Sequence, residues 1–140
     1  MPYSTVVVGT DGSATAETAV QHAGKLAADH GARLVIVTAY ETPVDQRDGE
    51  RNVADRDQAE EKAMYAKTLA TELGATRVVV QAVSGSAPDV LLATATDVGA
   101  DVIVVGSKGL TGASRFVLGS VASAVSHHAP CDVLIVQTSA

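Results

Sequence analysis

Five short runs of β-branched residues constrain the fold of this 140-residue chain more than any other feature. Each run is continuously apolar and does not alternate with polar residues, which is typical of strands covered on both faces in a parallel sheet. The runs occupy residues 5–9, 33–39, 77–83, 101–106 and 132–138. They predict five parallel strands.

Helical periodicity fills the intervals between these runs. The first helical segment covers 13–30, with Ser13 as a candidate N-cap and Gly31 as a stop signal. Three further segments follow, at 53–73, 87–98 and 118–128. The alternating order predicts an α/β fold of the Rossmann-like type, with right-handed crossovers, helices on both faces of an open sheet, and one domain over 1–140.

Composition and charge narrow the classes of partner. Apolar residues make up 46% of the chain and aromatic residues only 3%, so small aliphatic side chains must build the core. The net charge is −6 and the pI is near 5.0, whereas binding to nucleic acid or to anionic membranes needs a basic surface. The first residues do not resemble a secretory signal peptide, and the apolar runs are far shorter than the ~20 residues that a membrane-spanning helix needs. We therefore expect a cytoplasmic protein with no nucleic acid and no membrane among its partners.

Two loops at strand ends are unusual. Residues 9–13 read GTDGS after the first run, and 106–120 read GSKGLTGASRFVLGS after the fourth. Ligands of open parallel sheets bind beyond the carboxyl ends of the strands, where strand order reverses. If these two strands are neighbours, both loops meet at one crevice, and the N–H groups of 119–121 at the last helix can receive a phosphate. A loop that only turns remains the alternative, since neither a Walker A motif nor a dinucleotide fingerprint is present.

The glycine spacing carries a family resemblance. Gly106, Gly109, Gly119 and Ser120 fit the pattern G-x2-G-x9-G-[ST], which resembles the ATP-binding signature of the universal stress protein family. The opening VVVGTDGS and the closing PCDVLIVQ also resemble their counterparts, so the resemblance covers essentially the whole chain. It implies the strand order 3-2-1-4-5 and a homodimer.

The resemblance also implies a ligand. Members that keep the signature hold ATP, or in some cases AMP or cyclic AMP, and Mg²⁺ is expected to accompany ATP. Asp11, next to Thr10, would lie beside the ribose and phosphates, and the backbone of Ala39 would meet adenine. The signature glycines, Ser120 and the Val121 N–H would surround the ribose and phosphates. A carboxylate so close to phosphates requires that Asp11 face ribose hydroxyls or share Mg²⁺.

Other polar residues of the second loop have two interpretations each. The hydroxyls of Ser107 and Thr111 either donate to phosphates or are solvated. Lys108 and Arg115 either neutralise phosphate charge or extend into solvent. The polar segment 41–52, longer than most βα loops, is either a solvated loop or a lid over the ligand.

The remaining chemistry-bearing side chains indicate structural roles. His127 and His128 end the last helix, where a positive charge complements the dipole, and His22 and His30 are expected on the surface. Cys131 is expected to be a small buried thiol. No metal site is expected at these positions.

The sequence favours a stress-response regulatory protein that binds adenine nucleotide and an unidentified protein partner. No nucleophile–base pair, general base or arginine finger is evident, so at most weak ATP hydrolysis is expected. A nucleotide-free interaction scaffold and a slow ATP hydrolase remain the alternatives.

Overall fold

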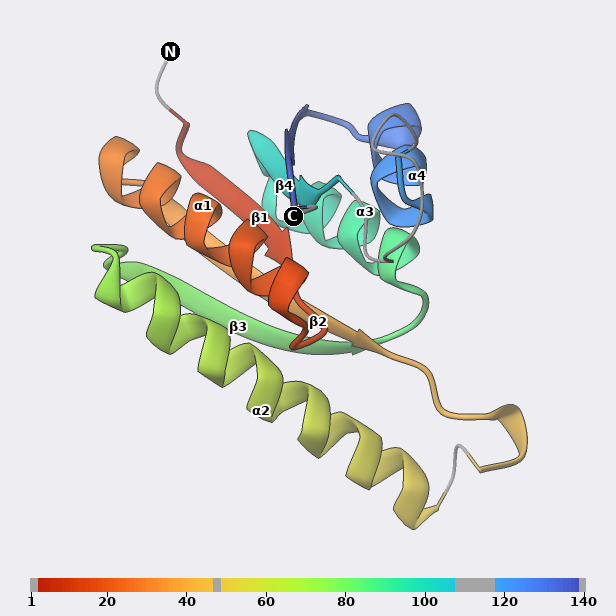
Figure 1. Ribbon diagram of the computed structural model, residues 1–140. Coiled ribbons are helices and arrows are strands. Elements are labelled where there is room, and N and C mark those ends of the chain that lie inside the picture. The colour runs from red at the N-terminus through yellow and green to blue at the C-terminus, as the bar shows by residue number, and fades with distance from the viewer. Residues whose placement is uncertain (1–2, 47–48, 108–117, 139–140) are drawn as a thin grey trace.

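The computed structural model describes residues 3–46, 49–107 and 118–138. Five strands form one parallel sheet in the order β3-β2-β1-β4-β5, which confirms the expected topology (Figure 1). The strands are β1 (Thr5–Gly9), β2 (Arg33–Tyr40), β3 (Arg77–Ser84), β4 (Val102–Gly106) and β5 (Asp132–Val136). The chain runs outward from β1 to β3 and then returns to β4 on the other side of β1. Strand order therefore reverses between β1 and β4.

Helices cover both faces of the sheet (Figure 1). They are α1 (Ala14–His30), α2 (Glu50–Glu72), α3 (Ala87–Val98) and α4 (Ser120–His128), with a short 3-10 turn at Val44–Gln46. The first two helices pack on one face, and α3 and α4 on the other. Three boundaries differ from the sequence prediction by two residues or more: α2 begins at 50 rather than 53, α4 at 120 rather than 118, and β5 ends at 136 rather than 138.

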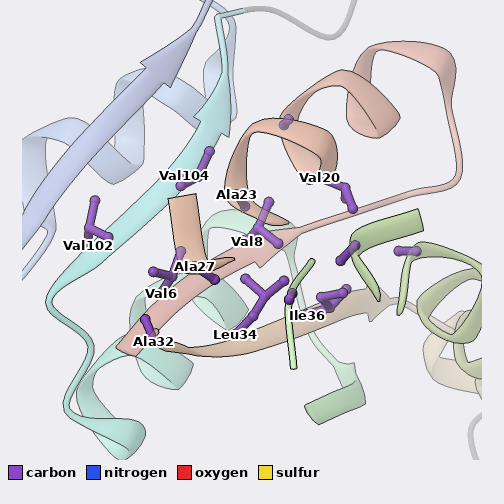
Figure 2. Close-up of a cluster of buried hydrophobic side chains, with 14 of the residues drawn as sticks. Val6, Val8, Val20, Ala23, Ala27, Ala32, Leu34, Ile36, Val102 and Val104 are labelled. Carbon is purple, nitrogen blue, oxygen red and sulfur yellow. The ribbon is translucent and has the colours of Figure 1, made fainter. Parts of the chain in front are cut away.

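Small aliphatic residues fill both core layers, which explains why the strand runs do not alternate. Neighbouring residues of a strand point to opposite faces, and here each face is covered by helices. Figure 2 shows the layer under α1, where strand residues face helix residues: Val6, Val8, Leu34 and Ile36 against Val20, Ala23 and Ala27. Val7 and Ile103 belong to the opposite layer. The core holds the central strands rigidly under the loops that follow them.

Local capping signals fix where α1 begins and ends. The Oγ of Ser13 accepts the Ala16 N–H at 3.2 Å, and Gly31 ends the helix with a φ of 64°. Both capping predictions are confirmed. The expected surface position of His30 is wrong, because this half-buried side chain accepts the Tyr3 N–H at Nδ1, at 3.0 Å, and its ring contacts the tyrosine ring.

The prediction for Cys131 also needs correction. Its side chain is half-buried rather than buried, because it directly precedes β5, an edge strand of the sheet. Burial raises the pKa of the thiol, and the nearby carboxylates of Asp132 and Asp101 raise it further. Cys131 therefore carries a neutral thiol at neutral pH.

Candidate functional site

A cavity of about 380 Å³ opens where strand order reverses, beyond the carboxyl ends of β1, β2 and β4. Its size lies in the range of small-molecule sites. Seven of the residues proposed from the sequence line it: Thr10, Asp11, Ala39, Gly106, Gly119, Ser120 and Val121. The fold thus brings the loops after β1 and β4 together at one crevice, as the two loop sequences led us to expect.

Two proposed residues are not among those that line the cavity. Gly109 lies outside the described residues, together with Lys108, Thr111 and Arg115. Ser107 is described and is only 9% exposed, but it does not line the cavity. Its hydroxyl oxygen instead accepts the N–H of Thr138 at 3.1 Å.

The loop after β1 is shaped by its own hydrogen bonds. Thr10 donates its N–H to the Val37 carbonyl at 3.0 Å and accepts the Gly12 N–H at Oγ1, at 3.1 Å. The Oδ1 of Asp11 accepts the Ser13 N–H at 2.9 Å, which closes a turn typical of aspartate. Gly12 has a φ of 83°, a conformation that other residues rarely adopt. The position of Asp11 is therefore set before any ligand arrives.

Asp11 carries a negative charge at the edge of the cavity. Partial burial is the largest single influence on its pKa and raises it, but hydrogen bonds from Ser13 and the charge of Lys62 together outweigh burial. The net effect lowers the pKa below the ordinary aspartate value. The side-chain stem of Lys62, on α2, packs over Gly12. Sequence reasoning missed Lys62, because nothing in the pattern of α2 indicates that it reaches the first loop.

The N-terminus of α4 forms another side of the cavity. Gly119 is the N-cap, and its N–H donates to the Ser107 carbonyl at 2.8 Å, so the expectation that this N–H is free is wrong. The N–H groups of Ser120 and Val121 have no hydrogen-bond partner within the described parts of the chain. They lie at the positive end of the helix dipole, where an anion is stabilised.

The rest of the cavity wall is apolar. Helices α1 and α3 and strand β2 contribute side chains that the sequence analysis did not name: Ala16, Val37, Ala87, Val90 and Leu91. The apolar residues at the start of α3 directly follow the Ser86 N-cap. A helix that begins next to a strand end brings its first turn to the cavity, and this position in the sequence could have predicted their role. The cavity therefore offers an apolar wall together with a carboxylate and unpaired N–H groups, which suits a ligand with a flat apolar ring and an anionic group.

Metal-ligating side chains do not gather elsewhere in the described ranges. Within 3–46, 49–107 and 118–138, no three residues among His, Cys, Asp and Glu lie close enough together to hold a metal ion. Over the same residues, no helix combines the length and apolar character needed to cross a bilayer.

Fold and crevice together place the chain in the class of open α/β proteins with a cavity at the topological switch point of the sheet. The sequence model of the family described as "Universal stress protein family" matches residues 2–137. The chain belongs to the universal stress protein family.

Relatives and solved structures agree with this assignment. A putative universal stress protein of Staphylococcus epidermidis is 34% identical, over 97% of this chain and 85% of the relative. A universal stress protein solved in complex with cAMP is 36% identical with a TM-score of 0.85, covering 99% of this chain and 100% of that one. The Archaeoglobus fulgidus universal stress protein in complex with dAMP is 26% identical with a TM-score of 0.71, over 96% and 98% of the two chains.

Proposed function

We propose that the crevice binds an adenine nucleotide and that the protein acts as a nucleotide-dependent regulator in a stress response. One observation carries the proposal: a single cavity joins an apolar wall, the Asp11 carboxylate and the unpaired N–H groups of α4. A nucleotide is a ligand with matching parts, namely a flat base, ribose hydroxyls and a phosphate. The complexes of two relatives with cAMP and dAMP support the same ligand class.

Each part of the nucleotide has a group in the crevice that suits it. The N–H groups of Ser120 and Val121, with the Ser120 hydroxyl, suit the phosphate. The carboxylate of Asp11 suits the ribose hydroxyls, to which it can only be an acceptor. The apolar wall and the backbone of Ala39 suit adenine. Gly106 lines the cavity with its backbone.

Mg²⁺ fits this site only as an ion that arrives with the nucleotide. Asp11 is the one carboxylate among the described residues that line the cavity. Mg²⁺ is usually held by one or two carboxylates together with phosphate oxygens. We therefore assign Mg²⁺ to the ATP complex and expect AMP and cyclic AMP to bind without it.

We expect regulation to operate through a change in the protein surface when the nucleotide binds. A nucleotide that binds one conformation better than another shifts the population toward it, which changes what a protein partner meets in the cytoplasm. We expect ATP hydrolysis to be weak at most, since Asp11 already accepts the Ser13 N–H and lies beside Lys62, an arrangement that lowers its pKa and makes it a poor general base.

The assembly we propose is a homodimer that pairs two copies of β5. This strand is an edge of the sheet, and Leu134 and Ile135 are 40% and 37% exposed. An apolar edge with unpaired backbone groups favours pairing with another strand. A two-fold axis would let the same edge serve both copies.

Calorimetric titration tests the ligand class directly. ATP, ADP, AMP and cyclic AMP are titrated with and without Mg²⁺, and GTP and GMP serve as controls for the base. We expect saturable binding of the adenine nucleotides, with Mg²⁺ dependence confined to those with two or more phosphates. If none of the adenine nucleotides binds to the folded protein at millimolar concentration, the proposal is refuted.

A further inference from the structure

Ser107 joins three segments of the chain at the end of β4. Its N–H donates to the Val136 carbonyl of β5 at 2.7 Å, and its own carbonyl accepts the Gly119 N–H at 2.8 Å. Its Oγ accepts the N–H of Thr138 at 3.1 Å and lies 3.4 Å from the hydroxyl oxygen of that threonine. The strand that precedes the crevice, the segment after β5 and the N-cap of α4 therefore meet at one residue.

The contact between Ser107 and Gly119 substitutes for an ordinary helix cap. Gly119 has no side chain to accept an N–H of the first turn, and no side chain of the described residues caps α4 in its place. The direction of the Ser120 and Val121 N–H groups therefore depends on where the Gly119 backbone is held. Ser107 holds it from outside the cavity, since its own atoms do not line the cavity wall.

The segment after β5 packs against the same place. A Cβ added to Gly106 would lie 2.9 Å from the Cγ2 of Thr138, so this threonine covers the glycine that lines the cavity. Ser107 is 9% exposed, and its hydroxyl oxygen is engaged by Thr138 rather than directed at the cavity. The hydroxyl thus serves the junction between β4 and the end of the chain.

We propose that Ser107 is a positioning residue, which with Thr138 holds the N-cap of α4 in place for the phosphate and links the end of β5 to the nucleotide site. This inference rests on the proposed function for its ligand and replaces the idea that the Ser107 hydroxyl donates to phosphate. Because linkage is reciprocal, an anion bound at α4 also stabilises the contact between Ser107 and Thr138. Nucleotide binding then stabilises the segment after β5 through Ser107, without direct contact between that segment and the nucleotide.

The Ser107→Ala variant tests this role, because it removes only the hydroxyl and keeps both backbone hydrogen bonds. We expect the Gly119 N–H to exchange with solvent about three- to tenfold faster than in the wild-type protein without ligand, the scale of one lost hydrogen bond. AMP affinity should fall by a similar factor, whereas adenosine affinity should stay unchanged because adenosine has no phosphate. General destabilisation would weaken both ligands.

Ser126→Ala is the matched control. Its hydroxyl also makes one hydrogen bond, to the Ser123 carbonyl at 3.0 Å, but it is exposed and lies within α4 away from the N-cap. We expect this variant to match the wild-type protein in Gly119 exchange and in AMP affinity. Saturating AMP should slow exchange of the Thr138 N–H in the wild-type protein, and this effect should be lost in Ser107→Ala.

The outcomes separate the inference from the proposed function. Unchanged Gly119 exchange in Ser107→Ala overturns the positioning role, and weaker AMP binding alongside unchanged exchange assigns the hydroxyl to the phosphate instead. A wild-type protein that binds neither AMP nor ATP refutes the proposed function and the ligand part of the inference. Exchange at Gly119 still tests the contact with Thr138 in that case, because it is measured in the free protein.

Discussion

Replacing Asp11 by Asn separates the two roles that the structure gives this residue. Asp11 closes a turn by accepting the Ser13 N–H at 2.9 Å, and it presents a charged carboxylate to the cavity. Asparagine keeps an oxygen that can accept the same N–H and loses only the charge. Asp11→Asn should therefore fold and unfold like the wild-type protein while binding nucleotide more weakly.

The size of the effect follows from the difference between charged and neutral hydrogen bonds. A hydrogen bond to a charged group contributes about 1.5–3 kcal/mol and a neutral one about 0.5–1.5 kcal/mol, so the substitution costs about 1–1.5 kcal/mol. That corresponds to about a five- to twelvefold rise in Kd. Because Asp11 is only partly buried, water still screens its charge, and we expect the lower part of this range.

Calorimetry at several pH values supplies the assay. The pKa of Asp11 is lowered in the free protein, so the carboxylate stays charged through neutral pH and into mild acid. The contribution of Asp11 to affinity should be complete at neutral pH and should be lost as the pH falls through that lowered pKa. In Asp11→Asn this acid-dependent loss should be absent.

Asp11→Ala provides the comparison, because alanine removes the turn as well as the charge. It should bind nucleotide more weakly than Asp11→Asn and should also lower the melting temperature. If Asp11→Asn bound AMP and ATP as tightly as the wild-type protein, and only Asp11→Ala were weaker, Asp11 would be a turn residue without a part in binding.

Three further changes test the helix terminus, the sheet edge and the start of β1. Gly119→Val should abolish nucleotide binding in a folded protein, since the backbone at φ −65° accepts valine and this residue lines the cavity, where we expect a branched side chain to take the place of the phosphate. Unchanged ATP affinity in a titration would remove α4 from the site. Ile135→Lys should yield a folded monomer, and light scattering that finds the wild-type protein monomeric would refute the dimer. The N–H groups of Ser4 and Thr5 donate to the Asp101 carboxylate and lower its pKa, so the stability that this carboxylate contributes is present above the ordinary aspartate pKa and is lost as the pH falls through the lowered value. In thermal melts, Asp101→Asn should therefore weaken the fall of the melting temperature in acid. An unchanged fall would contradict this role.

The fold was predictable because each core strand is apolar on both faces, a pattern that few other arrangements satisfy. Boundaries were less predictable where tertiary contacts decide them. Helix α2 begins at Glu50 without a side-chain cap, and Thr42 bonds Asn52 and Asp55 in its first turns. None of the described residues of the segment 41–52 lines the cavity. Its buried residue, Thr42, instead fixes the start of α2.

The site was predictable where it is built from residues close together in the sequence. It was less predictable where side chains distant in the sequence meet in the fold. The glycines and the turn at Asp11 lie close together in sequence, so their pattern is visible in the chain. Neither interpretation of the Ser107 hydroxyl included Thr138, because this partner comes 31 residues later and follows the last strand. Lys62 was missed for the same reason, since only the packing of α2 brings it over the loop after β1.

The two faces of the sheet are not covered by helices to the same extent during synthesis. The layer under α1 and α2 draws most of its residues from the first 75 positions, whereas the opposite layer needs α3 and α4 to cover Val7, Val35 and Val37. A nascent chain that has formed β1, β2 and β3 therefore has one face largely covered by α1 and α2 and one bare apolar face. Until the second half leaves the ribosome, that bare face is a surface for chaperones or for aggregation.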